Sequence, residues 1–472
     1  MVARCLLFEH QAISNQKYFD FVIAIVYCCR AFTNIPPRAR SFELFNTVIL
    51  EEPSLALGTN LESSSDVSAR TIINFKDTTG SDMSATDQIS SITEAAQLRA
   101  QTLSALRHRN NFISQQNVLI GFDGFVDEII RVVDKRDTPA EYTLIGDINT
   151  FAQRIAQASG QSTNMEMIVQ QTKLGGNGPI MANALAAFGM PVTYIGMLGY
   201  PNIHPVFKDF AQRAHVLSVA EPGHTDALEF NDGKLMMGKH ESLHEFTWNL
   251  LIQRVGTEKF LSAFQNATLL GLVNWTMYAH MSEIWRHLIS DICPKLSASP
   301  RKTIFFDLAD PEKRFADDIL EALNLITQFQ KYFSVILGIN EKESDELANV
   351  LNIPNSGNSP AALQELAQAM RTRLQLECVV IHPRTCAVAA TAQETAYVDG
   401  PFTAKPLIST GAGDHFNAGF SLGFVSSLPL ASCLLLGVST SGFYVRTGKS
   451  PRVEDLVGFM SNWPPNERAS II

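Results

Sequence analysis

The sequence predicts an α/β fold with a doubly wound, mostly parallel central sheet, helices on both faces and a small accessory β-sheet. Three observations carry this prediction. Short apolar runs alternate with amphipathic helix-length segments, glycine-rich turns precede two of those helices, and a hairpin signal interrupts the alternation midway along the chain. Strands that are separated by helices form parallel sheets, because each crossover helix packs back onto a face of the sheet.

The expected elements of the central sheet follow one another in order. Six apolar runs of strand length are predicted to be strands, at residues 117–122, 192–197, 267–273, 303–308, 333–337 and 379–382. Amphipathic segments between them are predicted to be helices, for example 179–188, 281–288, 317–328 and 361–374. A ligand of such a sheet is expected at the carboxyl ends of the strands.

The hairpin signal lies in residues 226–239. Asn231-Asp232-Gly233 stands between two short strand-like runs, and an Asx-Gly pair at this position is typical of a tight antiparallel turn. Antiparallel hairpins within α/β chains often form a separate small sheet, so we expect one here.

The first ninety residues differ from the rest in composition. Residues 54–90 are rich in Ser, Thr, Asp and Gly without sustained periodicity, which predicts a linker or disordered arm. Ser91 and Glu94 have capping-box spacing and predict a first helix from about residue 92. The segment before the apolar run 21–29 is too long and too acidic for a signal peptide. If the N-terminal region directs the protein to a compartment, an organelle-targeting extension is therefore a better explanation than a signal for secretion.

Composition excludes several classes of protein. The net charge of −10 works against binding to nucleic acid, and no apolar run has the length that a membrane span requires. The seven cysteines are scattered without paired spacing, so neither a zinc site nor a redox dithiol is expected. We therefore predict that the protein resides in a reducing compartment, and the cytoplasm is the first choice.

The stretch STGAGDHFNAGFSL, residues 409–422, places two glycines and an aspartate directly before a helix. Free amides at a helix N-terminus stabilise a phosphate or oxyanion, so Gly411, Ala412 and Gly413 are a candidate anion hole. Asp414 in the first turn is a candidate general base for an alcohol that attacks a phosphoryl group. The alternative is a glycine turn with Asp414 as an ordinary helix cap.

A second glycine cluster, Gly175-Gly176-Asn177, also precedes a helix. It has neither dinucleotide-fingerprint nor P-loop spacing. Its glycines would let a polyol approach the backbone, with Asn177 bound to a hydroxyl. A turn that leads into the helix through Pro179 explains the same residues without a ligand.

Carboxylates follow two predicted strands. Asp123 and Asp127 are candidates to accept hydrogen bonds from substrate hydroxyls, although both are also common turn residues. Asn340 and Glu343 have capping-box spacing, and they are equally suited to hold water around a Mg²⁺ ion that neutralises nucleotide phosphates.

In this order, these motifs resemble those of the ribokinase-like, phosphofructokinase-B-type carbohydrate kinases, over about residues 113–455. The resemblance implies an anion hole at Gly411, Ala412 and Gly413, with Asp414 as base. It implies a sugar site at Asp123, Asp127, Gly175, Gly176 and Asn177, Mg²⁺ near Asn340 and Glu343, and a nucleotide site that includes Asn340, Thr410, Ser441 and Gly448.

Composition and the resemblance together predict an organisation for the chain, in which the first ninety residues lie outside the resemblance. Residues 1–90 would be an extension, 91–460 the ribokinase-like kinase domain and 461–472 a tail, with a β-sheet lid near 128–148 and 224–240. Two departures stand out, because Ile180 occupies a position where many members carry asparagine, and 380–386 lacks the usual glycine-containing turn.

The predicted activity is transfer of the ATP γ-phosphate to a hydroxyl of a sugar or sugar-like alcohol. Mg²⁺ is the expected cofactor, with K⁺ as a further candidate, and a homodimer is one expected state of assembly. Three alternatives stay open: a nucleoside kinase, an ADP-dependent sugar kinase, and a catalytically silent sugar- or nucleotide-binding scaffold.

Overall fold

The computed structural model describes residues 85–465 and 467. The chain divides into two units between Gln97 and Leu98, and the predicted targeting segment lies outside the described residues. Helix α2 (Ala85–His108) begins before the predicted capping box, so the predicted helix start and the linker prediction for 85–90 were wrong. No glycine or proline separates Ala85 from Ser91, and the helix therefore continues through the polar segment.

The central sheet has nine strands in the order β14-β13-β12-β11-β10-β9-β1-β5-β6. Neighbouring strands from β12 to β6 are parallel, while β13 and β14 add an antiparallel edge. All six predicted strands are confirmed in this sheet. The strands are β1 (Val118–Phe122), β5 (Val192–Gly196), β6 (His215–Ser218), β9 (Leu269–Val273), β10 (Lys302–Asp307), β11 (Phe333–Ile339), β12 (Cys378–Ile381), β13 (Cys386–Ala390) and β14 (Thr395–Asp399).

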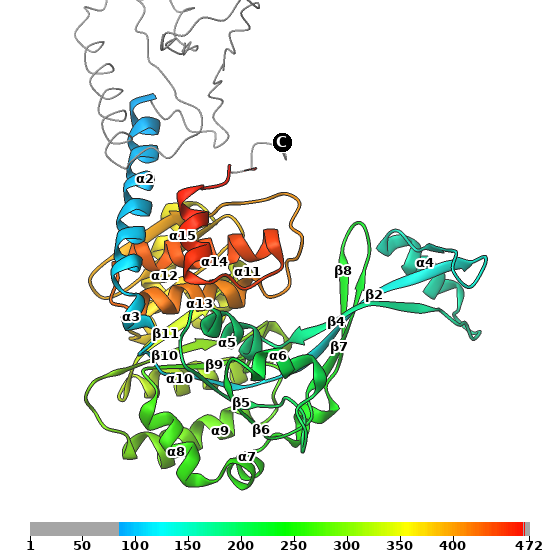
Figure 1. The fold of residues 1–472 in the computed structure, drawn as a ribbon, viewed down its shortest axis with the longest axis horizontal. Coiled ribbons are helices and arrows are strands. Elements are labelled where there is room, and N and C mark those ends of the chain that lie inside the picture. Colours follow the sequence, from blue (N-terminus) through cyan, green and yellow to red (C-terminus); the bar gives the residue numbers. More distant parts are fainter. Residues whose placement is uncertain (1–84, 466, 468–472) are drawn as a thin grey trace, which may run out of the picture. The chain divides into compact units, whose positions relative to one another are not determined.

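Helices cover both faces of this sheet, as predicted (Figure 1). Phe305 and Phe306 are successive residues of β10 and are buried in different hydrophobic clusters, because side chains of a strand alternate between its two faces. One cluster includes α7 (Trp248–Val255), α8 (Thr257–Asn266), α9 (Met281–His287), α10 (Ala316–Phe329), α11 (Glu341–Leu351) and α12 (Pro360–Leu374). The other includes α5 (Asn177–Ala187), α13 (Ala412–Val425), α14 (Leu430–Thr447) and α15 (Val453–Ser461).

The structure also contains a second, smaller sheet of five strands, which we call the lid sheet. Its strands are β2 (Phe125–Arg136), β3 (Tyr142–Leu144), β4 (Met167–Gly175), β7 (Gly223–Glu229) and β8 (Lys234–Lys239). The predicted hairpin is confirmed, since β7 and β8 pair antiparallel and the Phe230 amide donates to the Gly233 carbonyl. Helix α4 (Ile148–Gln157) lies at the far end of the lid sheet, where Phe151 joins a small separate core with Leu228 and Phe230 (Figure 1).

No helix among the described residues is long and apolar enough to cross a membrane.

Candidate active site

Polar side chains gather at the carboxyl ends of five adjacent strands. Asp123 follows β1, Asn274 follows β9, Asp307 ends β10, Asn340 follows β11 and His382 follows β12. The N-terminus of α5 contacts these strand ends, because the Gly178 amide donates a hydrogen bond to Asp123. The first turn of α13 lies beside it, because Asn177 donates a hydrogen bond to Asp414. The site therefore occupies the position that a parallel sheet offers for ligands.

Asp123 is fully buried and held from several sides. Its Oδ1 accepts the Gly178 amide at 2.8 Å and its Oδ2 accepts Asn274 Nδ2 at 3.1 Å. Burial raises the pKa of Asp123 to about 6, and the hydrogen bonds from Asn274 and Gly178 oppose that shift. The carboxylate is fixed in position and retains lone pairs that substrate hydroxyls can use.

The second glycine cluster lies directly against these carboxylates. A Cβ atom on Gly175 would stand 2.4 Å from the Asp127 carboxyl carbon, and one on Gly178 would stand 2.4 Å from Asp123 Oδ1. Gly176 has φ of +93°, a conformation that side chains disfavour. Glycine is required here because the chain must pass close to two buried carboxyl groups.

Asp127 lies on β2 in the lid sheet, which begins three residues after the end of β1. It pairs in register with Lys173 on β4 and Thr225 on β7. Burial raises the pKa of Asp127, and the charge of Lys173 is the largest influence that lowers it. The structure thus places Asp127 within the lid sheet and Asp123 in the short loop that follows β1 of the central sheet.

Asp414 is buried at the N-terminus of α13. Its Oδ1 accepts Asn177 Nδ2 at 2.9 Å, and Gly411, the N-cap residue, has φ of +93°. Burial raises the pKa of Asp414 well above its ordinary value, and the charge of Asp307 adds to this shift. Ile180 also belongs here, because a Cβ on Gly411 would lie 3.2 Å from Ile180 Cδ1, so this isoleucine packs against the predicted anion hole.

Asp307 and Glu343 form a pair of buried carboxyl groups. Glu343 accepts the Asn340 amide at 2.8 Å and the Asp310 amide at 2.9 Å, and Asp307 accepts Asn417 Nδ2 at 2.8 Å. Burial, followed by the charge of Asp307, raises the pKa of Glu343 to about 8. The capping box that the sequence predicts is present, since Asn340 Oδ1 also accepts the Glu343 amide.

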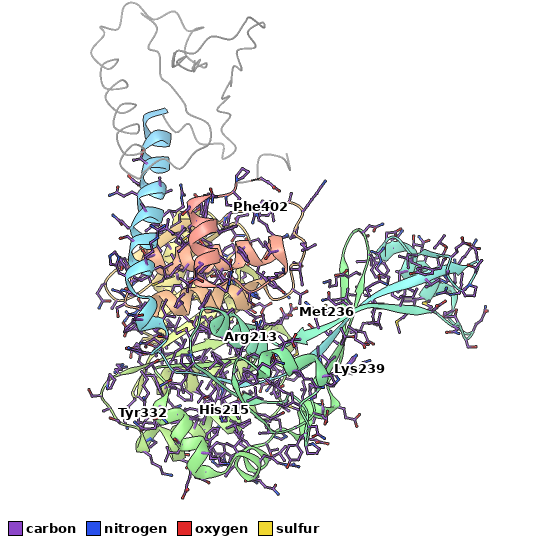
Figure 2. The ribbon with its side chains drawn as sticks, viewed as in Figure 1. Arg213, His215, Met236, Lys239, Tyr332 and Phe402 are labelled. Atoms are coloured by element: carbon purple, nitrogen blue, oxygen red, sulfur yellow. The ribbon has the colours of Figure 1, made fainter. Side chains whose placement is uncertain are left out.

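A cavity of about 340 Å³ lies next to the first turn of α13. Its lining includes Asn340, Ala412, Gly413, Ser441 and Phe402. Phe402 is labelled in Figure 2. Other lining residues come from the atypical segment after β12, and from α14: His382, Pro383, Arg384, Val438, Gly442 and Val445.

Two predicted nucleotide residues do not line this cavity. Thr410 lies beside it, where its carbonyl accepts the Tyr444 hydroxyl at 2.9 Å. Gly448 is the left-handed C-cap of α14, so a structural role accounts for it.

Sequence reasoning missed several polar residues of the site. Asn274 and Asp307 lie at strand ends, and the rule that ligands bind there offers a signal that could have found them. Lys173 and Asn417 carried no comparable signal, because a residue within a strand or helix is placed at a site only by tertiary contacts.

Comparisons with known proteins identify the family. A family model described as prokaryotic ketohexokinase matches residues 96–463. The ketohexokinase of Haloferax volcanii is 28% identical over 348 residues, which cover 73% of this chain and 91% of that protein.

Solved structures share the fold at low identity. A ribokinase from Arabidopsis thaliana, complexed with ribose and ATP, has a TM-score of 0.51 and 13% identity, covering 73% of this chain and 98% of its own. A putative sugar kinase from Clostridium perfringens has a TM-score of 0.50 and 13% identity, covering 74% of this chain and 96% of its own. With a family model that spans most of the chain and a ribokinase-like architecture, the protein belongs to the prokaryotic ketohexokinase family and is a sugar kinase, a phosphotransferase that acts on an alcohol group.

Proposed function

We propose that this enzyme transfers the γ-phosphoryl group of ATP to a hydroxyl of a ketohexose, with Asp414 as the general base. The position of Asp414 carries the proposal. Its carboxylate is hydrogen-bonded to Asn177, whose neighbour Gly178 binds Asp123, while the preceding Gly413 lines the cavity. Asp414 is thus linked on one side to the buried carboxyl group of Asp123, which suits hydroxyl groups, and adjoins on the other a cavity that suits a nucleotide. The name of the Haloferax volcanii relative supports a ketohexose as acceptor.

The residues divide the chemistry among them. Asp123 orients the sugar, and Asp414 accepts the proton of the attacking hydroxyl as the bond to phosphorus forms. The amides at the start of α13 stabilise the negative charge on the transferring group, because the helix N-terminus carries a partial positive charge there. Closure of the lid sheet would keep water from competing with the sugar.

Asp307 and Glu343 are suited to hold Mg²⁺ through its water shell. Both carboxyl groups are buried and fixed by hydrogen bonds, and a divalent cation would relieve the unfavourable proximity that raises the pKa of Glu343. When bound, Mg²⁺ would neutralise charge on the nucleotide phosphates.

The test is a coupled assay of the purified full chain, with ketohexoses, aldohexoses, pentoses and nucleosides as acceptors and ATP or ADP as donors. Phosphorylation of ketohexoses with ATP is expected. Preference for a nucleoside acceptor or an ADP donor would replace the proposal with one of those kinases, and binding without transfer to any acceptor would favour a scaffold. The cytoplasmic compartment, the homodimer and K⁺ stay predictions.

Gly413→Ala separates the nucleotide role of the anion hole from its structural role. A Cβ on Gly413 would meet only His382 Cε1 at 3.5 Å, an ordinary contact, and alanine suits a helix better than glycine. The variant should therefore unfold at the wild-type temperature or above it. Because the methyl group would point into the cavity where the phosphates approach, kcat/KM for ATP should fall by about a hundredfold. Wild-type turnover in a stable variant would contradict the anion-hole assignment.

Because Glu343 is a buried carboxyl group with a raised pKa, we expect the melting temperature to depend on pH and on Mg²⁺. Glu343 has a folded pKa of about 8, above its unfolded value, so its contribution to stability is lost as the pH rises toward 8. Burial lowers the pKa values of His382 and His415 to about 4, so both are neutral in the folded state, and the unfolded chain loses the rest of their protons between pH 6.5 and about 7.5. Their contribution opposes this trend only weakly, and only in that range. In EDTA, the melting temperature should fall by about a few degrees between pH 6.5 and 8.5.

Differential scanning fluorimetry checks this trend in EDTA and in Mg²⁺. Mg²⁺ should raise the melting temperature most at pH 8.5, where Glu343 is free of its proton, and Glu343→Gln should flatten the pH response. A melting temperature that rises with pH in EDTA would contradict the assignment.

A further inference from the structure

Lys173 lies on the face of the lid sheet that also carries Asp127. The pair is in register across β2 and β4, and Thr225 stands opposite Asp127 on β7. The Nζ atom of Lys173 is buried and makes no hydrogen bond with any residue that the structure describes. A buried ammonium group without a partner is unfavourable, so its retention points to a ligand that completes its hydrogen bonds.

Lys234, on the same face, connects the lid sheet to the residues that directly precede α13. Strand register places Glu229 and Lys234 opposite each other, and alternation places both on the side of Thr225. Lys234 Nζ lies 2.8 Å from Glu229 Oε1 and donates to Thr410 Oγ1 at 3.3 Å. Thr410 directly precedes Gly411, so this ammonium group stands next to the N-terminus of α13.

The charges of Lys173 and Lys234 act on the same buried carboxyl group, that of Asp127, and on each other. The charges of both lower the pKa of Asp127, while burial lowers the pKa of Lys173 itself. The charge of Asp414 also acts on Lys173, which places that ammonium group near the predicted base. The opposite face of the lid sheet carries Lys239, which is labelled in Figure 2. Its ammonium group pairs with Asp226, and its side chain is 60% exposed.

We propose that Lys173 and Lys234 form a phosphoryl subsite that binds the phosphate of the sugar phosphate product and the same group during transfer. This proposal rests on the proposed function. As the bond from the sugar oxygen to phosphorus forms, the bond from phosphorus to the leaving ADP oxygen breaks and the hydroxyl proton passes to Asp414. A neutral sugar thereby becomes a dianionic phosphate ester beside buried carboxylates, and the two ammonium groups offset that change in charge.

The subsite explains why the face of the lid sheet that carries Asp127 also carries two cations, although the sugar itself is uncharged. Hydroxyl groups need only carboxylate and amide partners, which Asp123 and Asn177 already offer. The negative charge develops during transfer, so cations placed there lower the barrier more than they strengthen sugar binding. The structural alternative is that Lys173 only holds Asp127 in its ionised form, which would affect sugar binding instead.

The test compares Lys173→Met and Lys234→Met with the matched control Lys239→Met, in the full chain. Calorimetry with the ketohexose phosphate that the wild-type enzyme produces, or with commercial fructose 1-phosphate and fructose 6-phosphate, measures binding without turnover. Lys173→Met and Lys234→Met should each bind the phosphate at least about tenfold more weakly than the wild type, because a charge-assisted hydrogen bond is lost. Their kcat should fall by about tenfold or more while the KM for the sugar changes little. Lys173→Arg should restore part of both, and Lys239→Met should match the wild type.

The outcomes separate this subsite from the proposed function. If the wild type phosphorylates no ketohexose, the proposed function fails, while phosphate binding that depends on Lys173 and Lys234 would still support the subsite. If phosphate binding is unchanged in both variants, the subsite is overturned, whatever happens to kcat. A rise in sugar KM alone overturns it in favour of the structural role beside Asp127.

Discussion

Asp414→Asn is expected to lower kcat by about a hundredfold to ten-thousandfold, the range that a general base contributes. The substitution retains the shape of the side chain, and its Oδ1 can still accept the hydrogen bond from Asn177. It removes the lone pair that takes the proton of the attacking hydroxyl. Stability should be retained, because burial already disfavours the ionised form of Asp414.

The measurements are steady-state kinetics, with sugar and ATP binding by calorimetry. Both ligands should bind Asp414→Asn with affinities near those of the wild type. Asp317→Asn is the matched control, since Asp317 also lies in the first turn of a long helix but is exposed. It should leave kcat unchanged. Turnover at the wild-type rate in Asp414→Asn would refute the proposed mechanism.

Gly178→Ala should damage both stability and sugar binding. The new Cβ would stand 2.4 Å from Asp123 Oδ1 and 2.6 Å from the Tyr194 hydroxyl, and both side chains are fully buried. Neither neighbour can move freely, because Asp123 is bound to Asn274 and Tyr194 donates to the Asp123 carbonyl. We expect a loss of about 1 to 3 kcal/mol in unfolding free energy, and at least about a tenfold rise in the KM for the sugar.

Gly458→Ala is its control. Gly458 is exposed on α15, and a Cβ there would meet nothing within 4 Å. This variant should be as stable as the wild type or more so, by up to about 1 kcal/mol. Chemical denaturation measures both variants. Unchanged stability and unchanged KM in Gly178→Ala would show that the pocket around Asp123 is less tightly fixed than its contacts indicate.

The central sheet was predictable because each strand is an apolar run that differs sharply from its surroundings. Both faces of a parallel sheet are buried, so β1, β9 and β11 are almost entirely apolar. Three strands of this sheet were not predicted: the edge strands β6 and β14, and β13 beside β14. β13 is CAVAA, and its three alanines give little β-propensity.

The lid sheet was predictable only in part. The hairpin at Asn231 has a local signal, because the turn itself requires particular residues. The pairing of β2 with β4 and β7 has no such signal, since it joins segments that are distant in the sequence. That pairing places Asp127 opposite Lys173 on the lid sheet, while Asp123 lies at the carboxyl end of β1 in the central sheet.

The sequence by itself determined six strands of the central sheet, several of its helices and the residue types at their ends. Glycines precede α5 and α13, and carboxylates follow β1 and β11. These features are local, because helix N-termini and strand ends impose their own requirements on nearby residues. Only the tertiary structure decided which of these groups meet. It joined Asn177 to Asp414, set Asp307 beside Glu343 and buried the ammonium group of Lys173. Burial and proximity shift the pKa values in the site, and both depend on long-range packing that no short stretch of sequence encodes.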